Sequence, residues 1–234
     1  MKGKLKIVIL ATLTFLLVGS VSSYPLGAET ADVIESSRFN QTIPPTQIDA
    51  QAGNVTELSL TGIAVTRFWQ GFYGNITGTI ILSDATGNNF YDWGITNPTG
   101  QVYASRNDSV SWSDVACPTP VEIEEEETFL GQLETDPDSI TNTFSESNHP
   151  EFLVGTQLLE NCPTTQAFSS GGTQDENFWQ ILLSSEGEMI YTTLIEDTTP
   201  EGFDGRPWHF QLLVGENGVQ NTNPTPYYFY LELQ

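Results

Sequence analysis

The chain has 234 residues, and 7 Lys and Arg stand against 30 Asp and Glu, so its formal net charge is −23. Nucleic-acid binding is excluded as a function class, because neutralising phosphates requires clustered cations that this composition lacks. Hydrophobic residues make up 38% of the chain and aromatic residues 11%, which suffices for a core and excludes a disordered acidic polymer.

Residues 1–23 have the layout of an export signal. The three lysines of the chain precede an apolar stretch from Ile7 to Val18, and small residues follow up to Ser23. This order predicts a signal peptide cleaved after Ser23. A membrane anchor is the alternative, but the apolar run of about 12 residues is shorter than the roughly 20 that a spanning helix needs. We therefore expect a secreted or surface protein without a transmembrane segment in the exported chain.

Residues 24–54 are predicted to form an extended leader or linker. They are polar, contain Pro44-Pro45 and show little periodicity. Such a segment can be a tether, the first strand of its own sheet, or a strand donated to the sheet edge of another copy.

From residue 55 the pattern changes to the alternation of apolar and polar side chains that is typical of strands. In the first half, strands are expected around residues 58–65, 76–83, 91–95 and 102–105. In the second half, they are expected at residues 178–183, 189–195, 208–214 and 227–233. Gly, Pro and Asn turns separate them, which favours antiparallel neighbours. Residues 55–234 are therefore predicted to be one all-β domain, an antiparallel β-sandwich or open barrel.

The segment 117–162 differs from the strands around it. Cys117 and Cys162 are the only cysteines, and in an exported chain such a pair predicts one disulfide. Between them lie an acidic run that includes Glu124–Glu127, a short helix expected from Asp136 to about Phe144, and one strand expected within residues 152–159. We expect a disulfide-tied excursion of loop and short helix.

Three motifs carry a resemblance to a known group of proteins. They are residues 68–75 (FWQGFYGN), residues 202–205 (GFDG) and the closing residues 227–233 (YYFYLEL). Together they resemble a group of exported archaeal surface proteins of unassigned function. The resemblance implies an extracellular surface location and nothing about catalysis.

Four Asn-x-Ser/Thr sequons are candidates for glycosylation, at Asn40, Asn54, Asn75 and Asn107. About this many are expected by chance in a chain so rich in Asn, Ser and Thr. Their turn-like or polar contexts favour access to solvent, so a glycoprotein is predicted where the host performs the modification.

No cofactor is predicted, and calcium is the one ion for which oxygen ligands cluster. Asp84, Asn88 and Asn89 share one turn, and the acidic run with Asp136 and Asp138 offers a second group. No spacing matches a twelve-residue EF-hand loop, and acids solvated on a secreted surface are the alternative.

Catalytic patterns are scarce. The two histidines lie in no zinc-protease motif, and no serine lies in a nucleophile elbow. Asp204, Arg206 and His209 form the densest polar cluster, whose spacing favours a turn with an ion pair. We predict no catalytic residues and no enzyme, although 30 acids leave a glycoside-acting enzyme with paired carboxylates as an alternative.

These observations favour a secreted or cell-surface structural or adhesive protein that acts through contacts with other surface proteins or itself, as in a filament or surface layer. A carbohydrate-binding β-sandwich module is the alternative, because five tryptophans and eight tyrosines could include a sugar-stacking platform.

Overall fold

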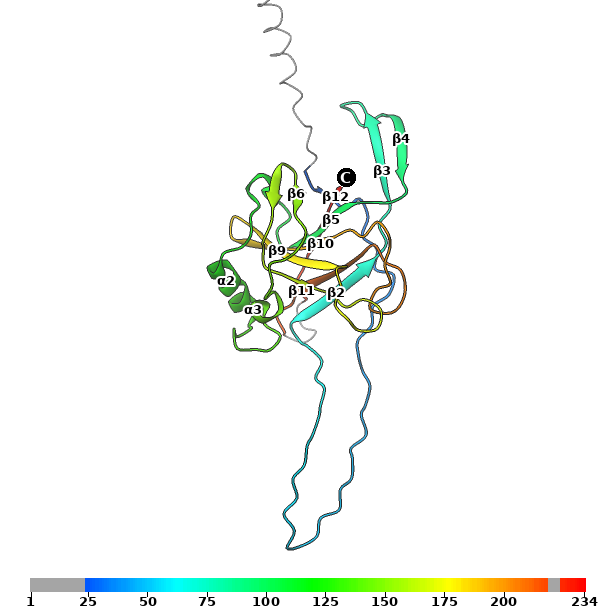
Figure 1. The fold of residues 1–234 in the computed structure, drawn as a ribbon. Coiled ribbons are helices and arrows are strands. Elements are labelled where there is room, and N and C mark those ends of the chain that lie inside the picture. Colours follow the sequence, from blue (N-terminus) through cyan, green and yellow to red (C-terminus); the bar gives the residue numbers. More distant parts are fainter. Residues whose placement is uncertain (1–23, 219–223) are drawn as a thin grey trace, which may run out of the picture.

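The computed structural model describes residues 24–218 and 224–234, so the export signal predicted at residues 1–23 lies outside the described part. The described strands are β1 (Leu26–Gly27), β2 (Trp69–Gly74), β3 (Gly78–Ser83), β4 (Asn89–Ile95), β5 (Gly100–Ser105), β6 (Phe152–Val154), β7 (Gln157–Leu159), β8 (Thr164–Gln166), β9 (Trp179–Ser185), β10 (Glu188–Leu194), β11 (Phe210–Gly215) and β12 (Tyr228–Leu233). The helical elements are the 3-10 helix η2 (Trp112–Asp114) and the helices α2 (Pro120–Leu130) and α3 (Ile140–Thr143). Figure 1 shows their arrangement, which confirms an all-β fold with a short helical excursion.

A six-stranded antiparallel sheet in the order β1-β12-β5-β10-β9-β8 forms the centre of the fold. All seven residues of β9 are buried, as are five of the six in β5. A strand buried on both of its faces lies between two covering layers, so the sheet is the middle layer of the fold.

The first covering layer is the two-stranded sheet β2–β11 together with α2 and α3. Leu182 and Tyr191 of the central sheet pack against Leu212 of β11, Leu130 of α2 and Ile140 of α3 in one buried cluster. This layer gives the fold its sandwich-like character.

A buried amide ties this layer to the central sheet. The Gln180 Nε2 donates to the carbonyl of Gln211 at 2.6 Å, and the Leu213 N–H donates to the Gln180 Oε1 at 2.7 Å. The Gln180 side-chain amide thus donates to and accepts from the backbone of β11, as the backbone of a neighbouring strand would.

The opposite face of the sheet is covered by the β6–β7 hairpin. Val154 and Leu159 pack with Ile181 and Ile190 in a second buried cluster, which also includes Cys162. The hairpin is held beside the sheet by the Cys117–Cys162 disulfide, so the predicted bridge is confirmed.

We expect loss of this disulfide to lower the free energy of unfolding by about 4 kcal/mol. The bond joins residues 45 apart in the sequence, and a loop of that length loses much conformational entropy in the unfolded state. Urea unfolding of the oxidised protein is compared with that of the Cys117→Ser/Cys162→Ser variant. Equal unfolding midpoints would contradict the prediction.

Inside the disulfide loop the structure differs from the expectations in two places. The acidic run lies on α2, where no helix was expected, and α3 begins after its N-cap Ser139 rather than at Asp136. The segment expected to be one strand is the β6–β7 hairpin, which turns at Gly155 with φ +56°. A Cβ at Gly155 would lie 2.4 Å from the ring of Tyr24, so the lack of a side chain at Gly155 leaves room for that ring.

His149 lies buried beside the disulfide as a neutral side chain. Its Nε2 accepts the Cys162 N–H at 2.9 Å, so Nδ1 carries the proton and donates to the Pro150 carbonyl at 2.8 Å. Burial lowers the pKa of His149 below its ordinary value of 6.5, although the bond to Pro150 acts in the opposite direction.

Because the unfolded chain binds this proton more readily, His149 should make stability fall as pH drops through 6.5 toward the lower pKa of the folded state. The loss is absent above that window. Melting temperatures of the unmodified chain and of His149→Gln, which keeps an acceptor but does not titrate, are compared between about pH 5 and pH 8. Parallel curves for the two proteins would contradict the prediction.

Candidate functional site: an apolar arm and an apolar hairpin

The most unusual feature of the fold is a long excursion between β1 and β2, residues 29–67, here called the arm. The Ala28 N–H donates to the Phe229 carbonyl at 3.0 Å before the arm begins, and Phe68 is buried where it ends. Every residue from 31 to 67 is exposed, and the arm extends away from the body of the fold (Figure 1). Its exposed large apolar side chains are Val33, Ile34, Phe39, Ile43, Ile48, Val55, Leu58, Leu60, Ile63 and Val65.

Residues 58–65 were expected to form strands, and this expectation is wrong for the single chain. The segment has the alternation of a strand but no strand assignment, and no strand of the described chain pairs with it. A strand needs a partner for its N–H and C=O groups. The alternation of apolar and polar side chains shows that the segment is suited to a strand, but it does not provide that partner.

The segment 24–54 divides between the sheet and the arm. Leu26 and Gly27 form β1, which pairs with Leu231 and Tyr230 of β12. From residue 29 the chain belongs to the arm, and it makes a turn at the tip in which the Asn54 N–H donates to the Gln51 carbonyl at 3.2 Å.

The second feature is the antiparallel hairpin of β3 and β4, here called the hairpin, which projects from the end of the body opposite to the arm (Figure 1). In its register Ile80 faces Trp93 and Leu82 faces Tyr91, so these four side chains share one face. They are 48–59% exposed, and the rings of Tyr91 and Trp93 lie 4.8 Å apart.

The other face of the hairpin is more polar, with Thr79 opposite Gly94 and Ile81 opposite Asp92. A two-stranded hairpin with one apolar face in water is marginally stable. An exposed apolar patch of this kind marks an interaction surface. The hairpin therefore resembles part of a sheet that lacks a neighbouring element.

The proposed calcium turn is the tip of this hairpin. The Asp84 carboxylate accepts hydrogen bonds from the backbone and side chain of both Thr86 and Asn88, at 2.7–2.9 Å. The bonds from Asn88 and Thr86 hold the pKa of Asp84 well below its usual range. Asn89 instead bonds to Ser83, with 2.8 Å between Oγ and Oδ1. The Asp84 carboxylate thus stabilises the turn by accepting hydrogen bonds from residues of the same turn.

In the part of the chain that the structure describes, no group of three or more His, Cys, Asp or Glu is placed to hold a metal ion. Two acids of α2, Glu126 and Glu127, are instead buried in the fold, while Glu124 and Glu125 are exposed. The buried Glu127 accepts the Thr141 N–H at 2.7 Å, and the buried Glu126 pairs with Arg106 at 2.6 Å. Calcium binding stays a prediction.

The polar cluster of Asp204, Arg206 and His209 is only partly brought together. The Arg206 Nε and the Trp208 Nε1 donate to the Asp204 carboxylate at 2.6 Å and 2.9 Å. His209 makes a different contact, since its Nδ1 accepts the Ile76 N–H at 3.1 Å. Asp204 and Arg206 therefore form an ion pair within one turn, while His209 joins β11 to the connection between β2 and β3.

The four sequons lie at or near the surface. Asn40, Asn54 and Asn75 are exposed, and the first two belong to the arm. Asn107 is half-buried, and its Oδ1 accepts the Ser109 N–H at 2.9 Å.

The tryptophans divide by exposure. Trp179 is buried, Trp69, Trp112 and Trp208 are half-buried, and Trp93 on the hairpin is exposed. Of the five, Trp93 is the one whose ring is placed to stack on an external ligand.

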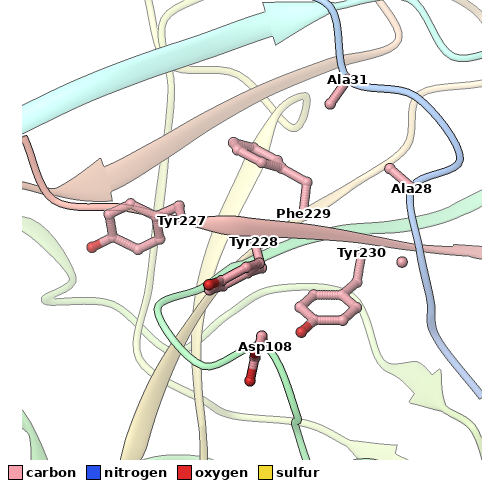
Figure 2. Close-up of a pocket in the computed structure, with 8 residues that line it drawn as sticks. Ala28, Ala31, Asp108, Tyr227, Tyr228, Phe229 and Tyr230 are labelled. Carbon is pink, nitrogen blue, oxygen red and sulfur yellow. The ribbon is translucent and has the colours of Figure 1, made fainter.

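A shallow groove of about 350 Å³ lies at the edge of β12 (Figure 2). Ala28 and Ala31 form one wall of the groove. Residues 227–230 line it along the edge of β12, and Asp108 lies beside Tyr228 and Tyr230. The chain's own entry into the arm therefore already borders this sheet edge.

No protein-family model, curated protein or solved structure matches this chain. Within residues 24–218 and 224–234, no helix has the length and apolar character to cross a membrane.

Proposed function

We propose that the protein is an exported structural or adhesive subunit of a cell surface that acts by binding further copies of itself. The observation that carries this proposal is the pair of apolar projections, the arm and the hairpin, at opposite ends of one body. Two different contact surfaces on one subunit make head-to-tail contacts, which continue as an open polymer when their rotation does not close a ring.

The charge distribution supports the same proposal. Acidic copies repel one another, so association must use surfaces that carry few acids. Residues 58–66 of the arm contain no charged side chain, and the hairpin strands contain Asp92 alone. The acids lie mainly in the body of the fold, where they keep the subunit soluble.

The test is electron microscopy and light scattering of residues 24–234 with the disulfide intact. We expect polymers that lengthen with protein concentration and with added salt, because salt screens the repulsion between acidic copies. A chain that stays monomeric at millimolar concentration in both low and high salt would contradict the proposal.

A second candidate function is carbohydrate binding, favoured by the exposed Tyr91–Trp93 pair. Stacked sugar rings would protect Trp93 from acrylamide quenching. Quenching is compared with and without polysaccharide, with Trp93→Leu as the control. Equal quenching of the unmodified chain in both conditions would dismiss this candidate.

A further inference from the structure

We propose that residues 58–65 of one copy, here called the arm strand, add as a third strand to the hairpin of a second copy. The inference rests on the proposed function and names the contact through which the subunits would join. Each element lacks what the other supplies: among the described residues, the arm strand pairs with no other segment, and the hairpin has two unpaired edges and an uncovered apolar face.

The side chains of the arm strand fit this role. Leu58 and Leu60 alternate in one phase and Ile63 and Val65 in the other, with Gly62 between them. A one-residue bulge at Gly62 would bring all four to the same face. That face would extend the apolar face formed by Ile80, Leu82, Tyr91 and Trp93.

The rest of the arm supplies a cover for the enlarged apolar face. Phe39, Ile43 and Ile48 lie on the other leg of the arm, beyond the tip turn, and all three are exposed. Three strands with a covered apolar face form an independently stable sheet, which two strands do not.

Although the arm as a whole is acidic, two of its cations are available to a second copy. Of the four arginines in residues 24–234, Arg106 pairs with Glu126 and Arg206 pairs with Asp204. The other two, Arg38 and Arg67, lie in the arm, where the described chain gives them no carboxylate partner. On the hairpin of a second copy, the exposed Asp92 offers one of these cations a carboxylate partner.

The arm strand and the hairpin of the same chain lie at opposite ends of the body, which favours pairing between copies over pairing within one (Figure 1). The groove beside β12 is a weaker acceptor. Its wall is the chain's own residues 28 and 31, and it contains Asp108 (Figure 2). By contrast, no strand within residues 24–218 and 224–234 pairs with either outer edge of the hairpin.

The experiment uses two defective chains of residues 24–234. The arm-defective chain carries Leu60→Asp and Ile63→Asp, and the hairpin-defective chain carries Leu82→Asp and Trp93→Asp. Controls place charge elsewhere: Thr46→Asp/Ala50→Asp in the arm is matched to the arm-defective chain, and Thr79→Asp on the other hairpin face is compared with Trp93→Asp alone. All seven replaced positions are exposed in the single chain, so equal melting temperatures check that each variant folds.

Each defective chain alone should require a protein concentration higher on the order of a hundredfold to assemble, because two apolar side chains lose their burial. The controls should assemble as the unmodified chain does. A mixture of the two defective chains should give dimers and nothing longer, since one intact arm meets one intact hairpin and both outer ends are blocked.

The outcomes separate this inference from the proposed function. If the unmodified chain assembles and the defective chains assemble equally well, the inference is wrong and the proposed function stands. If the unmodified chain does not assemble, the proposed function itself fails.

A cysteine pair tests which copy supplies the strand. In a chain carrying Ile63→Cys and Leu82→Cys, mild oxidation should give a ladder of covalent oligomers. A cross-link within single chains would show that the arm binds its own hairpin, and the absence of any new cross-link would show that the two segments do not meet. Either result would overturn the inference.

Discussion

The Gly100→Ala variant is expected to lose about 3–6 kcal/mol of unfolding free energy, the sum of a strained backbone angle and a steric overlap in a packed sheet. Gly100 begins β5 with φ +122°, a conformation that side chains rarely adopt. A Cβ there would lie 1.8 Å from the carbonyl oxygen of Glu232 on β12. The added methyl would therefore force β5 and β12 apart at the end of their ladder, where Gly100 faces Leu233.

Two glycines of the hairpin serve as controls that separate the cost of backbone strain from the cost of steric overlap. Gly87 has φ +86° with open space around its Cβ position, and Gly94 has open space and an ordinary angle. Gly87→Ala should cost about 1 kcal/mol through backbone strain, and Gly94→Ala should be close to neutral. Urea unfolding followed by circular dichroism gives all three values. A Gly100→Ala chain no less stable than Gly87→Ala would contradict the prediction.

The Arg106→Met variant is expected to lose about 3–5 kcal/mol, because it leaves a carboxylate buried without its counter-charge. The Glu126 side chain is only 4% exposed, and the Arg106 guanidinium binds it at 2.6 Å while stacking on the Phe129 ring at 3.8 Å. The hydroxyl of Tyr191 donates to the same carboxylate at 3.0 Å.

The exposed pair Arg206–Asp204 is the matched control, since its contact is also 2.6 Å but the arginine is 55% exposed. Arg206→Met should leave the unfolding midpoint nearly unchanged, because solvent screens an exposed pair. Equal losses for the two variants would mean that burial of Glu126 does not decide the cost.

The pH dependence gives a second readout for the same pair. Burial raises the pKa of Glu126 above its ordinary value of 4.5, while Arg106 and Tyr191 act in the opposite direction. Removing Arg106 should raise this pKa further, so the folded variant binds a proton more readily than the unfolded one. The deficit of Arg106→Met should therefore shrink as pH falls toward 4.5. Adding Glu126→Gln should recover part of the loss at neutral pH.

The strands could be predicted from sequence wherever their partners belong to the same domain. Residues 227–233 and 189–195 alternate, and they form β12 and β10 in nearly those bounds. Residues 58–65 alternate as well and form no strand, because periodicity reports which face a side chain would take and does not report whether a partner exists.

The helix α2 was missed, although the sequence carries its start and stop signals. Thr119 and Glu122 form a capping box, Pro120 occupies the first turn, and Gly131 ends the helix with φ +71°. The run of acids was interpreted as a charged loop segment, whereas Glu126 and Glu127 are buried on the inner side of this helix. The disulfide was predictable, because a chain with two cysteines has one possible intramolecular pairing.

The candidate site was only partly accessible to sequence reasoning. The polar leader predicted at residues 24–54 suggested strand donation from that segment, but β1 pairs Leu26 and Gly27 within the chain's own sheet. The unpaired alternation lies further along, at residues 58–65. That the hairpin exposes Leu82 and Trp93 could not be predicted, because a sandwich strand with the same pattern would bury them.

Hydrogen–deuterium exchange of residues 24–234 at increasing concentration tests the central claim most directly. Amides of residues 58–65 should exchange rapidly in dilute protein and become protected as polymers form, together with those of β3 and β4. Protection of residues 58–65 that is already complete in the dilute monomer would contradict the account, as would rapid exchange of these residues within formed polymers.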